Sequence, residues 1–475
     1  MFFNSLDFAL FLPVVFFLYW FIARNNLKIQ NILLLVASYF FYACWDWRFL
    51  FLLIFSTLLD YATGLSIAGA KKELTRKTWF YLTISVNLGF LAIFKYYNFF
   101  AESLVTSLAH VNLHLNLWTL NIILPVGISF YTFHGLSYVI DIYQKRIAPE
   151  KNFIDYSVFV SFFPLLVAGP IERATHLLPQ IKVKKEFQYA KVVDGLKQIL
   201  WGLAKKIIIA DHLAIYANMI FEDPSQYASS AIILGAICFA FQIYCDFSGY
   251  SDIALGTARL FGIELLKNFE YPYFSRDIAE FWRRWHISLS TWFRDYLYIP
   301  LGGSKGGTWM KIRNTFIIFI VSGFWHGANW TFIAWGALNA LFFLPLMLTN
   351  KNRTNIEIAA KGRILPSIKE FTGIVFTFCL TTFAWIFFRS ESISSALDLI
   401  SHLFSISIFS VPALWPIKLI LAFIVIEWLG REQPYAIAKF GLKWPKTLRW
   451  AFYYLLIGAI LYNTGSEQQF IYFQF

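Results

Sequence analysis

Apolar residues follow one another in runs along the whole chain, and many runs reach the roughly 20 residues that an α-helix needs to cross a bilayer. Runs of 13 to 22 residues occupy the ranges 6–22, 49–70, 79–94, 371–388 and 417–429. A membrane β-barrel would instead show segments of about 10 residues with alternating polarity. The pattern therefore predicts an all-α polytopic membrane protein. The first run lacks a basic segment before it and is expected to be a retained helix rather than a signal peptide.

Polar residues divide the chain into three regions that differ in how apolar runs and charged stretches are distributed. Residues 1–142 are dense in apolar runs with short connections, residues 143–315 mix apolar runs with charged stretches, and residues 316–475 return to apolar runs. No internal repeat or low-complexity linker separates these regions. A single membrane domain over 1–475 is therefore expected.

The charged residues act as topology signals. Only 14% of the residues are charged, against about 25% in soluble domains. The net charge of +12 is scattered between the apolar runs, which argues against nucleic-acid binding. Basic residues mark cytoplasmic loops, so the loop "KKELTRK" (71–77) is expected inside, and the stretch 97–118, which has no Lys or Arg, outside. This places both termini outside the cytoplasm, with about 10 to 12 crossings.

The stretch 273–307, "YFSRDIAEFWRRWHISLSTWFRDYLYIPLGGSKGG", combines charges and tryptophans more densely than any other part of the chain. Its spacing predicts one helix over 280–296 with an aromatic face, and Glu280 and Arg284 stand at i, i+4 and can pair. The proline and glycines that follow end this helix. Because it is too polar to face lipid, it is expected to be interfacial or re-entrant.

Arginines in this stretch allow two interpretations. Arg283, Arg284 and Arg294 are expected at the cytoplasmic interface, where they hold an anionic donor or neighbouring carbonyls. The alternative is pairing within the chain, with Glu280 and Asp295 as the partners.

Two histidines, His286 and His326, each follow a tryptophan (Trp285 and Trp325) in aromatic-rich segments 40 residues apart. Each could simply donate a hydrogen bond to a backbone carbonyl and hold two helices together. Ionisable groups within a membrane, however, usually face an interior cavity and serve function.

The surroundings of His326 favour the functional interpretation. On a continuous helix, Ser322 and Asn329 lie at i−4 and i+3 and give one polar face. A neutral imidazole in such a setting suits a general base that acts on an alcohol, and Asp295 is a candidate to orient a second imidazole. No cysteine or histidine spacing indicates a zinc site, and no metal is expected.

Two long motifs, "EFWRRWHISLSTWFRDYLYIPLGG" (280–303) and "GFWHGANWTFIAWGALNA" (323–340), resemble the membrane-bound O-acyltransferase family. The resemblance continues in 123–143, 163–173, 242–256 and the terminal "FIYFQF" (470–475). It is strongest to the bacterial branch that includes the membrane subunits of alginate and peptidoglycan O-acetyltransferases.

The resemblance implies a ring of helices with re-entrant segments around a tunnel, in the bacterial cytoplasmic (inner) membrane. It implies transfer of an acyl group, usually acetyl, from acetyl-CoA as donor substrate, with no permanently bound cofactor. The acceptor would be a hydroxyl of an extracytoplasmic polysaccharide, reached directly or through a periplasmic partner with a hydrolase-like (SGNH) domain, and membrane lipid surrounds the protein.

The roles of two histidines follow from the same resemblance: His326 is the expected catalytic histidine and His286 the second family position. From their places in the charged stretch and next to these histidines, the expected contacts to donor or acceptor are Trp285, Arg284, Arg294, Asp295, Trp325, Asn329 and Ser322. The alternative from another class is a transporter or channel with a histidine proton relay, although the inverted repeats and paired broken helices common in transporters are absent from the sequence.

Overall fold

The computed structural model describes residues 1–113, 119–120, 123–167, 169–404, 407, 410–464, 468 and 470–471. Within these residues every regular element is helical, as the apolar runs predict. The chain forms two compact units, which are described separately: the first comprises Met1–Tyr189 with Ala258–Leu266, and the second Ala190–Thr257 with Lys267–Phe475.

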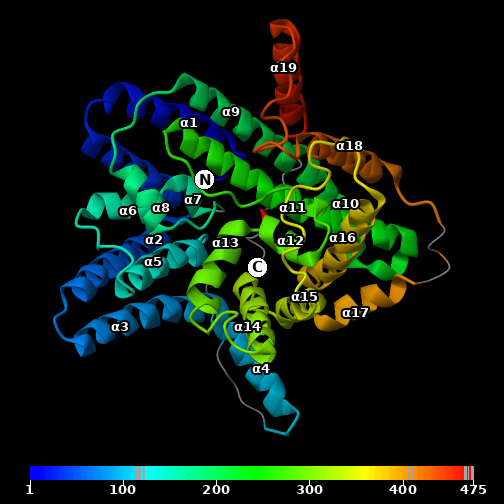
Figure 1. Ribbon diagram of the computed structural model, residues 1–475, viewed down its shortest axis with the longest axis horizontal. Helices are drawn as coiled ribbons and strands as arrows, with labels where there is room; N and C mark the ends of the chain where they lie inside the picture. Colours follow the sequence, from blue (N-terminus) through cyan, green and yellow to red (C-terminus); the bar gives the residue numbers. More distant parts are fainter. Residues whose placement is uncertain are drawn as a thin grey trace. The chain divides into compact units, whose positions relative to one another are not determined.

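The first unit contains the helices α1 (Leu6–Phe17), α2 (Leu27–Gly69), α3 (Glu73–Leu91), α4 (Tyr97–Ala109), α5 (Ile128–Tyr143), α6 (Phe153–Ser161), α7 (Phe163–Leu166) and α8 (Ala174–Ile181). Short π-helical turns, η1 (Leu18–Ile22) and η2 (Ala92–Tyr96), follow α1 and α3. Helix α2 packs beside α3, α5 and α6 (Figure 1). The buried Asp60 of α2 joins it to α3, because its carboxylate accepts hydrogen bonds from Thr83 and Asn87.

The second unit contains α9 (Tyr189–Leu203), η3 (Ala204–Ala210), α10 (Asp211–Glu222), η4 (Pro224–Gln226), α11 (Ser229–Leu260), η5 (Pro272–Phe274), α12 (Ile278–Arg284), α13 (Ile287–Phe293), η6 (Arg294–Tyr298), α14 (Thr308–His326), α15 (Trp330–Leu348), α16 (Ile368–Arg389), α17 (Ile393–His402), α18 (Leu414–Gly430) and α19 (Lys446–Tyr462).

Five helices in the described part of the chain are long and apolar enough to cross a membrane: Leu27–Gly69, Glu73–Ala109, Ser229–Leu260, Trp330–Leu348 and Ile368–Arg389. The first of them contains a kink, because Asp46 has extended backbone angles and its carboxylate binds the backbone N–H of Arg48. These helices confirm the predicted integral membrane protein. The stretch 97–109, expected as part of an outward loop, is helical as α4, so the expectation of a loop there is wrong, and its outward position stays a prediction.

Helices α14 and α15 lie side by side and carry His326 at their junction (Figure 1). Two glycines allow this close approach. A Cβ atom on Gly323 would lie 2.1 Å from the carbonyl oxygen of Phe332, and one on Gly336 would lie 2.3 Å from that of Phe319. Small residues at such contacts let membrane helices pack backbone to backbone. Gly323 and Gly336 therefore fix where the histidine stands.

Candidate active site

The segment 280–296 is not one helix, and the prediction of a single helix there is wrong. Helix α12 ends at Arg284, and α13 begins at Ile287. Between them His286 adopts the left-handed conformation, with φ of 43°. The preceding loop supplies the hydrogen bonds that break the helix, because the N–H of Glu270 donates to the carbonyl of Arg284 and the N–H of Ile287 donates to that of Asn268. The break separates His286 from both helices.

Asn268 orients the imidazole of His286. The Nδ1 atom of His286 lies 3.0 Å from Oδ1 of Asn268, and the same oxygen accepts a hydrogen bond of 2.7 Å from the Ser288 hydroxyl. The amide nitrogen of Asn268 faces Ser251 at 3.3 Å. Because Oδ1 can only accept, Nδ1 carries the proton and Nε2 keeps its lone pair. Burial lowers the pKa of His286 to about 3, so its imidazole is neutral at physiological pH.

His326 is the last residue of α14, and its ring centroid lies 6.3 Å from that of His286. Its other neighbours are aromatic: the centroids of Trp325, Trp335 and Phe388 lie at 4.9, 5.3 and 5.4 Å. Both histidines are almost completely buried, with 1% of His286 and 4% of His326 exposed. The structure thus brings the two motif histidines together inside the second unit.

A wall of indole rings continues from the two histidines. Trp285 is fully buried and its centroid lies 5.0 Å from that of Trp385, which in turn stacks on Trp335 at 5.5 Å. The ring centroid of Trp325 lies 6.0 Å from that of His286 and 4.9 Å from that of His326, so this indole is next to both imidazoles. Such a wall excludes water, and charge–dipole interactions within it are stronger than in water. The sequence indicated Trp285 and Trp325, but Trp385 lies in an apolar run where nothing distinguishes it.

Ion pairs fix α12 in place. Glu280 and Arg284 pair at 2.9 Å, as their spacing predicts, and Arg276 joins the same carboxylate at 3.0 Å. Glu280 is 1% exposed, so this triad lies inside the protein. Arg283 donates hydrogen bonds to the carbonyls of Asn352 and Asn355, which attach α12 to the loop after α15.

Arg294 and Asp295 pair with each other at 2.8 Å on η6, where the arginine side chain is 59% exposed. Together with the pairing of Arg284, this arrangement corresponds to the intramolecular alternative that the sequence left open. The residue that holds Nδ1 of His286 is Asn268, which no sequence signal indicated, because it is an isolated amide in the loop before α12.

The polar face expected around His326 is not formed as predicted. Ser322 precedes His326 by one turn of α14 and is buried, but the helix ends at His326 and Gly327 is extended. Asn329 consequently lies off the helix, where its side chain caps α15 and donates to the carbonyl of Glu391 at 2.8 Å. The glycine after the histidine ends the helix, so helical spacing does not apply beyond it.

A buried ion cluster ties the end of the chain to the second unit. Lys206 of η3 pairs with Asp211 at 2.7 Å and with Asp246 of α11 at 2.8 Å, and it also donates to the carbonyl of Gln468. The carboxylate of Asp246 accepts from the N–H of Ile471. No sequence signal indicated this cluster, because Asp246 and Gln468 lie far from Lys206 in the chain. Most of the tail expected to be extracytoplasmic, including residues 472–475, lies outside the described residues.

The C-terminal segment also reaches the histidine neighbourhood. The ring of Phe470 lies 4.1 Å from that of Tyr250 and 6.3 Å from that of Phe247. Phe247 in turn meets His286 edge to face at 4.6 Å. One aromatic side chain therefore separates the tail from His286.

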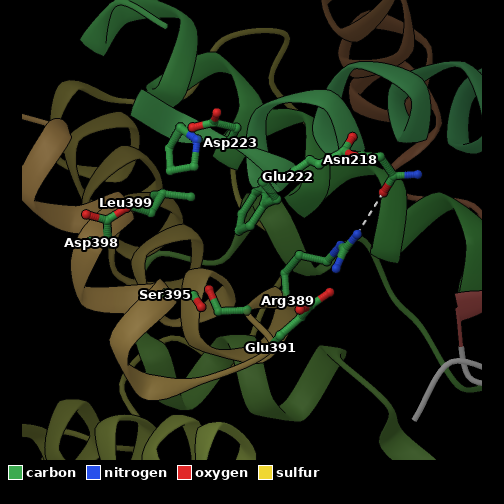
Figure 2. A pocket seen from close by; sticks show the side chains of 11 residues that line it. Asn218, Glu222, Asp223, Arg389, Glu391, Ser395, Asp398 and Leu399 are labelled. Atoms are coloured by element: carbon green, nitrogen blue, oxygen red, sulfur yellow. Dashed lines mark hydrogen bonds between the residues drawn. The ribbon is translucent and has the colours of Figure 1, made fainter. Parts of the chain in front are cut away.

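A cavity of about 530 Å³ opens beside the far end of α16 (Figure 2). Its lining includes Arg389, which follows the His326 neighbour Phe388 and binds the Asn218 side chain at 3.0 Å. The lining also includes four carboxylates, Glu222, Asp223, Glu391 and Asp398. The bond from Asn329 to Glu391 connects this cavity to the turn after His326. Over the described residues, no three His, Cys, Asp or Glu side chains group as metal ligands.

The chain is similar to known proteins along most of its length. The family model described as membrane-bound O-acyltransferase matches residues 34–388. The chain is 35% identical to the probable alginate O-acetylase of Pseudomonas putida, over 98% of both chains, and 38% identical to that of Pseudomonas aeruginosa, over 90% of this chain and 80% of the relative. It is 32% identical to the peptidoglycan O-acetyltransferase of Helicobacter pylori, over 98% of this chain and 95% of the relative.

Proposed function

The chain belongs to the membrane-bound O-acyltransferase family and is a membrane O-acyltransferase, and we propose that it transfers acetyl from acetyl-CoA to a hydroxyl of an extracytoplasmic polysaccharide. The names of its relatives support acetyl as the group and a glycan as the acceptor. These relatives are named as O-acetylases or as an O-acetyltransferase, so the alternative of a transporter or channel with a histidine proton relay has no support.

His326 is the proposed general base. An acceptor hydroxyl has a pKa far above 7 and attacks a thioester slowly unless a base takes its proton. In this reaction the hydroxyl oxygen forms a bond to the acetyl carbonyl carbon while His326 accepts the proton. The carbon–sulfur bond then breaks, and the imidazolium returns the proton to the departing thiolate of coenzyme A. One base therefore serves both halves of the transfer.

His286 is the proposed second member of the site. Its Nδ1 proton points to Oδ1 of Asn268, so the lone pair of the ring lies on Nε2, the atom proposed to accept a hydrogen bond from the reacting hydroxyl. The donor thioester would lie against Trp285 and Trp325, the indoles next to the two histidines. One observation supports the proposal above all: the ring centroids of His286 and His326 lie 6.3 Å apart, with aromatic side chains around them.

The basic loops support an orientation in the cytoplasmic membrane. With 71–77 and the basic loop 350–363 inside, the His326 end of α14 and the cavity beside Arg389 face away from the cytoplasm. We propose that both termini are extracytoplasmic and that the acceptor, or a periplasmic partner that carries the acetyl group onward, approaches through this cavity. Its mixture of carboxylates, amide and hydroxyl groups suits the hydroxyls of a sugar polymer.

The test is His326→Ala in a strain without its own copy of the protein. The variant should reduce alkali-labile acetate on the envelope polysaccharide by roughly 10²- to 10⁴-fold per folded molecule, because a general base contributes about that much. His110→Ala, an exposed histidine in the first unit, is the matched control and should retain full activity. A well-folded His326→Ala protein with near wild-type acetate would contradict the catalytic assignment.

A further inference from the structure

A second cavity, of about 600 Å³, lies within the first unit, where α2 turns into α3 and α5 ends. Its lining consists of Ile67, Ala68, Ala70, Lys71, Glu73, Arg76, Ile142, Lys145, Arg146, Ile147, Ala148 and Pro149. Both α2 and α3 are candidate membrane spans, so the turn between them lies at a membrane surface. The cavity therefore faces lipid headgroups or the water beside them.

Four cations line this cavity against one carboxylate, Glu73. Arg76 is held rigidly: it pairs with Glu73 at 3.2 Å, donates to the carbonyl of Tyr143, and stacks on the Tyr143 ring at 4.6 Å. Arg146 pairs with Asp141 at 3.0 Å. Lys71 and Lys145 are exposed at the rim. Fixed guanidinium groups with mobile ammonium groups around them are suited to a phosphate.

The backbone presents Lys145 to the cavity in an unusual way. The N–H of Lys145 donates to the carbonyl of Ile142 and that of Arg146 to the carbonyl of Asp141, which is the pattern that ends a helix with a left-handed residue. Glycine usually occupies that position, but here it is lysine, with φ of 60°. Side chains with a Cβ are disfavoured there, so the chain accepts strain where glycine would avoid it.

We propose that this cavity binds the phosphate of an anionic phospholipid headgroup. Arg76 and Arg146 are each paired with a carboxylate, so Lys71 and Lys145 supply the excess positive charge for the phosphate. Ile67, Ile142 and Pro149 offer an apolar wall to the glycerol and the first acyl carbons. Basic pockets between membrane helices at the cytoplasmic surface are known to bind anionic headgroups in this way. The inference goes beyond acyl transfer and does not depend on it, since all its residues belong to the first unit.

The test uses the full chain in neutral detergent and follows its thermal unfolding midpoint. Dioleoylphosphatidylglycerol should raise the midpoint at concentrations where dioleoylphosphatidylcholine has no effect. In the double variant Lys71→Gln/Lys145→Gln the concentration for half of this shift should rise about 25-fold, because each cation near a headgroup contributes about fivefold in affinity. Higher ionic strength should weaken the effect in the wild type.

Two control variants separate the cavity from general surface charge. Lys72→Gln/Lys77→Gln removes the same charge from neighbouring exposed positions that do not line the cavity, and it should leave the phosphatidylglycerol shift unchanged. Lys145→Gly removes the amine and relieves the left-handed strain. It should therefore keep or raise the lipid-free midpoint while it weakens the lipid shift, which a folding defect would not do.

Inorganic phosphate and coenzyme A test whether the cavity binds a soluble phosphate compound instead of a lipid headgroup. If either reproduces the shift at the same concentrations and the cavity variant removes it, the occupant is a soluble phosphate compound and the lipid proposal is wrong. Equal shifts with the two phospholipids, or equal losses in the cavity and control pairs, would also overturn it.

Discussion

The two histidines lie close together, yet the structures that carry them differ. His326 ends a regular membrane helix whose position is fixed by glycine contacts with α15, and its ring neighbours are mostly aromatic. His286 stands in a left-handed break between two short helices, and its Nδ1 is hydrogen-bonded to Asn268. Aromatic rings and glycine contacts are prominent around His326, whereas hydrogen bonds from the loop before α12 are prominent around His286.

This difference predicts that the two histidines contribute unequally to catalysis and to folding. The backbone contacts at Gly323 and Gly336 fix the end of α14 whatever side chain stands at position 326, so loss of His326 should affect chemistry more than folding. The break at His286 depends on the loop before α12, the Asn268 amide and the ion pairs of α12 at the same time. Groups in such a shared network are strongly coupled, and removal of one disturbs the others.

The largest expected effect compares His286→Ala with His326→Ala. Both should lose activity by about 10²-fold or more, but His286→Ala should lower the thermal unfolding midpoint further than His326→Ala, because it leaves the Asn268 carbonyl with one partner fewer. Acetate on the envelope polysaccharide and the unfolding midpoint of the purified protein measure the two effects. Asn268→Ala, which keeps the imidazole but frees its orientation, should fall between wild type and His286→Ala in activity. Equal destabilisation by both histidine variants would remove the distinction.

The next effect tests the ion pairs that position His286. Arg284→Gln leaves Glu280, which is 1% exposed, with Arg276 as its remaining cation in this triad. Breaking a buried pair in this way costs about 3–5 kcal/mol. The thermal unfolding midpoint should fall clearly, while the Michaelis constant for acetyl-CoA in the folded fraction should be unchanged. An unchanged midpoint with weaker use of acetyl-CoA would assign Arg284 to the donor instead.

Comparison of the two regions also shows what a sequence can predict. The apolar runs predicted the membrane helices, because length and hydropathy are local properties. The Glu280–Arg284 pair followed from helical spacing and is present. The helix break at His286 could not be predicted, because it depends on Asn268 and Glu270, whose hydrogen bonds replace those of the helix only once the loop has folded back.

The same reasoning explains the residues that the sequence did not reveal. Trp335 and Trp385 lie in apolar runs where an aromatic residue is ordinary, and only tertiary packing brings them to the histidines. Lys206 pairs with Asp246, which lies 40 residues further along the chain, and donates to the carbonyl of Gln468, which lies 262 residues further along. Periodicity contains no information on such long-range contacts. The two motif histidines were predicted because a polar ionisable group in an apolar segment is locally conspicuous.

A smaller effect concerns pH and His286 alone. Its pKa is about 3 in the folded protein and near 6.5 when unfolded, so between these values the unfolded chain binds the additional proton. The contribution of the neutral His286 to the free energy of unfolding is therefore fully present above about pH 6.5. It decreases as the pH falls toward 3, by about 2 kcal/mol at pH 5. The difference in unfolding midpoint between wild type and His286→Gln, measured at pH 7 and pH 5, isolates this contribution. A difference that does not change with pH would contradict the buried, neutral imidazole.

The smallest effect is expected at Arg294, the exposed counterpart of Arg284. Its pair with Asp295 is formed by a side chain that is 59% exposed, where water screens the attraction and the side chain loses entropy on pairing. Arg294→Gln should therefore change the free energy of unfolding by less than about 1 kcal/mol. If activity also stays normal, Arg294 is only a surface ion pair. A higher Michaelis constant for acetyl-CoA with an unchanged midpoint would instead show that the donor phosphates reach η6, which would extend the site from the buried histidines to the surface of the second unit.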